Sequence, residues 1–326
     1  MIIDFHNHFY PEGYVRELNS GDGYARVSTD GQGREIIEYT GDYNVVVGPH
    51  IRLEERLEAM AKYGIDLEVL SLTTPGVERE VPARGIKLAK TANDGFAKIC
   101  EKYPGKFRAL VSLPVQDPGA SVDELDRGVR DLGLRGVMLF SNANGKPLDS
   151  KELIPIYEKA AELDVPLFIH PTSPLNDRAM EDYRLVPIMG FTVDTSLALF
   201  RLVFSGILEH IPNLKVVVAH TGGVFPYLRG RIEIGYNAYQ ECRVNISSPP
   251  SFFFKRNVWV DTVCYDRDLL KSTYSFLGPD KILLGTDFPH QISDMANAVE
   301  RVKGLDIGDR EKGMILGENS SRLLKL

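Results

Sequence analysis

Short runs of apolar residues alternate with longer amphipathic segments along most of the chain. The short runs are rich in β-branched residues, which is typical of strands that are buried on both faces of a parallel sheet. We predict eight such strands, which are Ile2–Phe5, Leu67–Ser71, Arg108–Ser112, Gly136–Leu139, Leu167–Ile169, Lys215–Ala219, Val258–Asp261 and Lys281–Leu284.

The segments between the strands have the periodicity of helices that bury one face. The predicted helices include Arg52–Tyr63, Gly85–Tyr103, Val122–Leu132, Lys151–Leu163 with Ser150 as its N-cap, and Leu269–Phe276. Eight strands that alternate with helices favour an α/β fold of the (β/α)8 TIM barrel type over an open doubly wound sheet. We therefore expect a single barrel domain over residues 1–326.

Residues 11–50 do not follow this alternation, because they occupy the place of a single helix after the first strand. The stretches Tyr24–Val27 and Glu35–Tyr39 flank the turn-forming sequence Thr29–Gly33. This pattern predicts a β-hairpin inserted over the mouth of the barrel. An ordinary surface excursion is the alternative.

Composition and charge narrow the class of protein. The net charge of -7 and the pI near 5.6 argue against a nucleic-acid or anionic membrane surface. The cysteines Cys100, Cys242 and Cys264 are scattered and odd in number, so we expect no disulfide framework and a cytoplasmic location. We also expect no targeting leader and no stretch long and apolar enough to span a bilayer.

Polar residues gather where four of the predicted strands end. The first strand runs into His6 and His8, the fifth into His170, the sixth into His220 and the eighth into Asp287. Alternate residues of a strand share a face, so His6 and His8 can point together. Because the carboxyl ends of barrel strands converge, these five side chains should meet in one small volume.

Imidazole and carboxylate donors without thiolates suit a zinc ion, with manganese or iron as alternatives. Taken singly, His170 or His220 could be an ordinary core histidine, and Asp287 could cap a turn. Their coincidence at strand ends favours a metal site. The stretch 139–142 has no lysine or glutamate to bridge two ions, so we expect one ion. Asp261 is expected to hydrogen-bond a ligand rather than bind metal.

The other histidines are assigned separately. His210 lies at a predicted helix end and is interpreted as structural. His50 is placed at the surface. His290 follows Asp287 closely at the predicted mouth and is a candidate for contact with substrate. No nucleophile elbow, P-loop or dinucleotide fingerprint is present in the sequence, which argues against serine catalysis and nucleotide cofactors.

The motifs H-x-H, His-Pro, His-x-Gly-Gly and G-T-D-x-P, in this order, resemble the amidohydrolase superfamily. The chain is similar to the branch of 2-amino-3-carboxymuconate-6-semialdehyde decarboxylases and related nonoxidative decarboxylases. The likeness covers nearly the whole chain and includes the stretches 56–60, 113–117 and 228–231. It implies a metal-dependent decarboxylase of an unsaturated or aromatic carboxylic acid.

The resemblance also implies roles for individual residues. His6, His8, His170 and Asp287 would bind one divalent ion, with zinc expected and manganese as the alternative. His220 would be the acid/base residue beside the metal-bound water, so that His220 and Asp287 form the catalytic centre. A histidine titrates in the range needed to move that proton.

Substrate recognition is implied less directly. Arg231 matches an arginine that holds the substrate carboxylate and can come from the neighbouring subunit, which implies a homodimer; a helix salt bridge is its alternative role. The stretch 41–47 lacks an arginine that some members of the branch carry, which indicates a substrate with fewer carboxylates. A metal-dependent lactone or amide hydrolase would use the same site, and a non-catalytic metal-binding protein is a third class.

Overall fold

Parallel strands form the centre of the protein, in the computed structural model that describes residues 1–21, 23–40, 42–180 and 182–326. Each strand of the barrel pairs in parallel with its neighbours. In chain order they are β1 (Ile3–His8), β5 (Leu67–Ser71), β6 (Phe107–Ala109) with β7 (Val111–Ser112), β8 (Val137–Phe140), β11 (Leu167–His170), β12 (Val216–Val218), β13 (Val258–Asp261), and β14 (Ile282–Leu283) with β15 (Gly285–Phe288).

Two sheets join into one closed ring. Their orders are β15-β1-β5-β6 and β14-β13-β12-β11-β8-β7. The pair β6 and β7 is one strand interrupted at Leu110, and the pair β14 and β15 is one strand interrupted at Leu284. Backbone bonds persist at both interruptions, from Leu110 N to Leu70 O (2.9 Å) and from Phe5 N to Leu284 O (2.8 Å). The predicted eight-stranded barrel is therefore confirmed.

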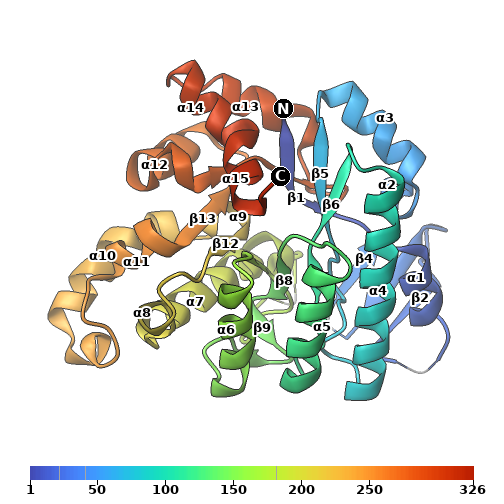
Figure 1. Ribbon diagram of the computed structural model, residues 1–326, viewed down its shortest axis with the longest axis horizontal. Coiled ribbons are helices and arrows are strands. Elements are labelled where there is room, and N and C mark those ends of the chain that lie inside the picture. Colours follow the sequence, from blue (N-terminus) through green and yellow to red (C-terminus); the bar gives the residue numbers. More distant parts are fainter. Residues whose placement is uncertain (22, 41, 181) are drawn as a thin grey trace.

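Helices surround the ring of strands (Figure 1). They are α3 (Leu53–Tyr63), α4 (Pro82–Lys102), α5 (Pro118–Arg130), α6 (Ile154–Glu162), α7 (Phe191–Phe204), α8 (Ile207–His210), α10 (Phe225–Ala238), α11 (Pro250–Asn257), α12 (Arg267–Leu277), α13 (Met295–Lys303), α14 (Asp309–Gly313) and α15 (Asn319–Leu324). The short element α9 (Ala219–Gly222) is instead a turn at the end of β12, with non-helical backbone angles at His220 and Thr221. The predicted helix from Lys151 begins as a separate turn, η1 (Lys151–Leu153). Its N-cap residue Ser150 makes no cap bond, because the hydroxyl donates to Pro147 O instead.

The segment 11–50 contains more structure than the predicted hairpin. Its elements are α1 (Glu12–Leu18), β2 (Ala25–Thr29), β3 (Glu35–Tyr39), β4 (Asp42–Val45) and α2 (Gly48–Ile51). The strands β2, β3 and β4 form an antiparallel sheet. Tyr39 and Asn44 both donate side-chain hydrogen bonds to Thr74, in the loop that follows β5. This small sheet is thereby attached at the carboxyl end of the barrel.

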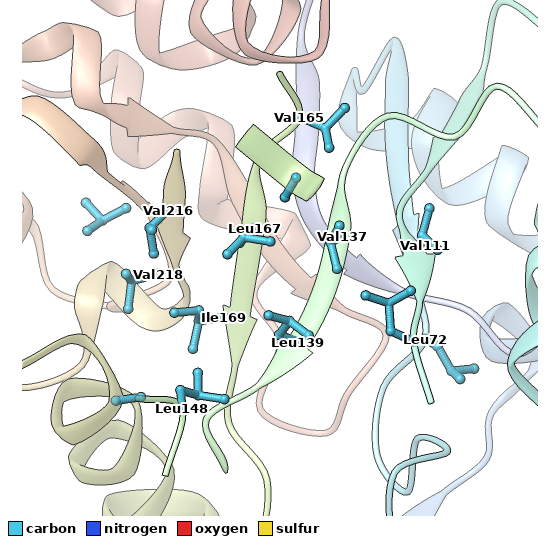
Figure 2. Close-up of a cluster of buried hydrophobic side chains, with 14 of the residues drawn as sticks. Leu72, Val111, Val137, Leu139, Leu148, Val165, Leu167, Ile169, Val216 and Val218 are labelled. Atoms are coloured by element: carbon cyan, nitrogen blue, oxygen red, sulfur yellow. The ribbon is translucent and has the colours of Figure 1, made fainter. Parts of the chain in front are cut away.

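Two apolar layers follow from the alternation of side chains along each strand. On β11, Leu167 and Ile169 face outward, where they pack with residues of neighbouring strands such as Val137 and Val216 (Figure 2). Phe168 faces inward and packs in the barrel interior. His170, two residues further along, shares the inward face at the carboxyl end of the strand.

A bulge in β1 turns its histidines inward. Asp4 pairs with Glu68 and Asn7 with Leu70, so three steps on β1 match two steps on β5. Phe5 already faces the barrel interior, and simple alternation would send His6 outward. The extra residue resets the alternation, so that His6 follows Phe5 onto the inner face, with its ring 4.9 Å from that of Phe168.

One helical stretch, Val186–Phe204, is long and apolar enough to cross a membrane by length and composition alone, with a mean hydropathy of 1.4. The expectation that no stretch meets this test was therefore wrong. Within the most apolar part of this stretch, 44% is buried inside the protein. It also contains the buried Asp194, whose carboxylate accepts three hydrogen bonds.

Candidate active site

The predicted ligands converge at the carboxyl end of the barrel. The Nε2 atoms of His6 and His8 lie 3.1 Å apart, and each is 3.2 Å from Oδ1 of Asp287. The ring of His170 lies 5.1 Å from that of His6 and 4.5 Å from that of His8. All four side chains are buried. One potential metal-binding group contains His6, His170, Asp287 and His220, and a second contains His8 with Asp287 and His290.

Hydrogen bonds at Nδ1 fix the tautomer of each of the three imidazoles. His6 Nδ1 lies 2.6 Å from Asp261 Oδ2, and His170 Nδ1 lies 2.9 Å from the carbonyl of Pro171. His8 Nδ1 is 3.1 Å from Ser71 Oγ, which gives its own proton to Asn7 O. Since each acceptor requires a proton on Nδ1, the lone pairs of the three Nε2 atoms face the centre.

These lone pairs and the Asp287 carboxylate repel one another unless a cation lies between them. His170 Nε2 and Asp287 Oδ1 are buried without a hydrogen-bond partner among the described residues. Burial opposes charge on His6, yet Asp261 and Asp287 outweigh it and raise its pKa to about 10, so a proton on His6 Nε2 supplies this positive charge until a bound metal ion replaces it. Burial lowers the pKa of His8 and of His170, so these rings stay neutral. The donor set therefore fits one divalent metal ion.

His220 lies beside this centre in an unusual backbone conformation. Its φ of 55° and that of Thr221, 56°, are in the left-handed region, which side-chain-bearing residues rarely adopt. Asp261 stabilises this turn by accepting hydrogen bonds from His220 N (3.0 Å) and Thr221 N (2.8 Å). The His220 Nε2 atom then lies 3.5 Å from Asp287 Oδ2, while Nδ1 has no partner within the described ranges.

Asp261 acts as predicted, because it binds His6 and three backbone amides rather than pointing at the centre. The expectation for His50 was wrong. His50 is fully buried, stacked on Tyr10, and its ring is 5.2 Å from that of His290. His290 in turn lies 4.9 Å from His8, at the mouth, where Thr73 Oγ1 is 3.1 Å from its Nε2.

Comparisons with known proteins agree with this geometry. Residues 3–326 match the amidohydrolase family. The chain belongs to this family. A 2-amino-3-carboxymuconate-6-semialdehyde decarboxylase from Dictyostelium discoideum is 33% identical to this protein, in an alignment that covers 99% of this chain and 91% of the relative's chain. A gamma-resorcylate decarboxylase from a Rhizobium species is also 33% identical, in an alignment that covers 84% of this chain and 87% of that relative's chain.

A solved structure of 5-carboxyvanillate decarboxylase from Novosphingobium aromaticivorans, with bound manganese and a nitrobenzoic acid derivative, has a TM-score of 0.86 to this chain. Its sequence is 27% identical, and the alignment covers 100% of this chain and 97% of that one. The barrel of this amidohydrolase is thus shared with that enzyme over the whole length.

A buried arginine behind the amidohydrolase centre was not among the predicted residues. Arg56 of α3 donates to His8 O (2.7 Å) and Asn7 Oδ1 (2.8 Å), and its Nε binds Glu68. Both Arg56 and Glu68 are fully buried. The arginine therefore holds the bulged end of β1 from outside the barrel. Its sequence signal is a charged residue on the apolar face of a helix, at Arg56 in Leu53–Tyr63.

Arg231 is set apart from the residues that the structure brings together. It lies on α10, which follows the His220 turn, and its side chain is exposed. Among the described residues it forms no ion pair. The alternative role for Arg231, a salt bridge within the helix, is therefore not formed in the part of the chain that the structure describes.

Proposed function

We propose that this amidohydrolase is a metal-dependent nonoxidative decarboxylase, a carboxy-lyase acting on an aromatic or unsaturated carboxylic acid. The observation that carries the proposal is the convergence of three Nε2 lone pairs and the Asp287 carboxylate beside His220. The named relatives, which cover most of this chain, are decarboxylases of this kind.

His6, His8, His170 and Asp287 would hold one divalent ion. The imidazole and carboxylate donors suit zinc, and the manganese in the related solved structure makes manganese the alternative. When bound, the ion supplies a Lewis acid that collects negative charge developing on a substrate oxygen. All four side chains are buried, so the ion would act in an environment of low dielectric constant, where its attraction for that charge is strong.

His220 would move the proton. Its side chain is slightly exposed toward the mouth, while Asp287 Oδ2 orients Nε2 at 3.5 Å. In decarboxylation the bond between the ring carbon and the carboxylate breaks, its electron pair stays on carbon, and carbon dioxide leaves. The carbon then takes a proton, which the imidazolium form of His220 delivers from Nε2.

The far end of the site favours a substrate with one carboxylate. The arginine that some members of the branch carry is absent from the stretch 41–47 of this chain. Within this stretch Gly41 lies outside the described residues. Arg184 nevertheless reaches this stretch from the loop after β11, and its Nη1 lies 2.6 Å from Asp42 Oδ1 while its guanidinium stacks 4.7 Å from the ring centroid of Tyr43. Asp42 neutralises that cation, so a second substrate carboxylate gains little there.

The remaining substrate contacts would come from His290 and Arg231. His290 lies at the mouth beside His8. Arg231 would make a bidentate contact with the substrate carboxylate of the neighbouring subunit in a homodimer. Exposed apolar residues on the same helix, Tyr227 and Ile234, support an interface there. A cytoplasmic location is proposed because all three cysteines are free.

The experiment is turnover with a panel of hydroxybenzoates and muconate-type acids, with carbon dioxide and metal content both measured. We expect release of carbon dioxide that requires about one zinc or manganese ion per chain. His220→Asn should retain the metal and lose turnover by about 100-fold or more. His210→Asn, which removes a histidine that binds Gly206 O far from the centre, is the matched control.

Other outcomes would overturn parts of this assignment. Hydrolysis of lactones or amides without carbon dioxide release would assign the site to the hydrolase class. Loss of metal from His220→Asn would make His220 a ligand. A monomer in light scattering that is fully active, or Arg231→Ala with unchanged KM, would exclude a shared site.

A further inference from the structure

Helix α7 contacts both the loop that follows His170 and the turn that follows His220. It follows β11 in the chain and precedes β12. Asp194 and Ser196 are both buried on this helix. Two residues apart, they point about 200° away from each other, so one helix can bind a different loop on each side.

The Asp194 carboxylate binds the loops after β8 and β11. Its Oδ2 accepts from Ser141 Oγ (2.5 Å) and Asn142 Nδ2 (3.0 Å), and its Oδ1 accepts from Leu175 N (3.0 Å). Ser141 N donates to His170 O (2.8 Å). The carboxylate of Asp194 thus fixes Ser141, which binds the backbone of His170. It also binds the backbone amide of Leu175, five residues beyond His170.

Ser196 binds the turn after His220. Its hydroxyl accepts from Val224 N (2.8 Å) and lies 3.0 Å from Gly222 O. The helix backbone approaches the same turn so closely that a Cβ on Gly223 would lie 2.1 Å from Thr192 O. Gly223 has a φ of 67°, so this contact requires glycine for two independent reasons. The left-handed turn of His220 is therefore held by Asp261 on one side and by α7 on the other.

We propose that Asp194 and Ser196 are positioning residues, through which α7 sets the place of His170 and His220 independently. The inference rests on the proposed roles of His170 as a metal ligand and His220 as the proton donor. Asp194 then governs metal affinity, and Ser196 governs the rate of the proton step. Neither residue touches the predicted ligand atoms.

The test compares Asp194→Asn and Ser196→Ala with Thr195→Val. Thr195 lies between them and is equally buried, and among the described residues its hydroxyl binds Phe191 O of α7 and no other group. Thr195→Val is therefore a control for removing a buried hydroxyl from the same helix. An amide in place of Asp194 sets its NH2 against the one donor at Oδ1 or the two donors at Oδ2, so at least one of the three hydrogen bonds is lost.

Asp194→Asn should weaken zinc and manganese affinity by about 10- to 100-fold, measured by chelator competition. Ser196→Ala should lower kcat about 10-fold or more with unchanged metal affinity and KM, because a small misplacement of a catalytic group is costly. It should also speed hydrogen exchange at the Val224 amide. Thr195→Val should change none of these.

The inference is overturned if Asp194→Asn has the metal affinity of Thr195→Val, or if Ser196→Ala has the kcat and Val224 exchange rate of that control. Metal affinity and hydrogen exchange do not depend on turnover. If the wild-type protein releases no carbon dioxide, the proposed reaction fails while these two measurements still decide the roles of Asp194 and Ser196.

Discussion

Replacing Arg56 by methionine tests whether the ion pair behind β1 supports the barrel. Arg56 and Glu68 have no exposed side-chain surface, and burial already raises the pKa of Glu68. Removing one partner of a buried pair costs about 3–5 kcal/mol, because the remaining charge has no counterion. At about 2.1 cal/mol/K per residue, the unfolding entropy of 326 residues is about 0.7 kcal/mol/K. The expected fall in Tm is then about 4–7 °C.

The assay is thermal unfolding of chelator-treated protein, so that metal binding does not mask the change. Arg52→Met is the matched control, because Arg52 on the preceding turn is exposed and its pair with Glu55 should contribute less than about 1 kcal/mol. The double variant Arg56→Met with Glu68→Leu should recover much of the loss. Equal Tm values for Arg56→Met and Arg52→Met would refute the reasoning.

Two further predictions concern single carboxylates. Asp261→Asn should weaken metal affinity by about 10- to 100-fold in chelator competition, whereas Asp266→Asn, at the N-cap of α12, should leave it unchanged; equal affinities would contradict the role of Asp261. Burial raises the pKa of Glu78 from 4.5 to about 7, so the native state keeps a proton that the unfolded state loses. Stability should therefore fall by up to about 3 kcal/mol as pH rises from 4.5 to 7, and Glu78→Gln should abolish this slope in denaturant titrations.

The fold was predictable because its strands are buried on both faces and therefore read as apolar runs. Val258–Asp261 and Leu67–Ser71 have the predicted bounds. Other bounds moved for local reasons. Arg108–Ser112 is interrupted at Leu110, and the strand predicted to end at Leu284 continues after a break as Gly285–Phe288. Whether a strand is interrupted depends on its pairing with the neighbouring strands. The pattern of apolar residues within one segment contains no information about that pairing.

The candidate site was predictable to the extent that it follows strand ends. The sequence places His170 and Asp287 there directly, because each comes at the end of a clear apolar run. His50 was misplaced, since it lies in the short helix α2, whose four residues show no periodicity, and tertiary packing against Tyr10 and His290 buries it.

The bulge in β1 shows why the H-x-H motif alone does not determine the site. Spacing puts His6 and His8 on one face, but which face depends on the register with β5 and β15. Gly285 permits the close approach on the β15 side, because a Cβ there would lie 2.8 Å from that of His6.

The supports of the centre come from parts of the chain that carry no motif. Asp261 fixes both His6 and the His220 turn, and Arg56 holds β1 from outside the barrel. A misplacement of about 1 Å can cost a catalytic step about 100-fold, so these contacts matter as much as the ligands themselves. Since each support binds backbone atoms as well as side chains, its partners become recognisable only when the strands are closed into a ring.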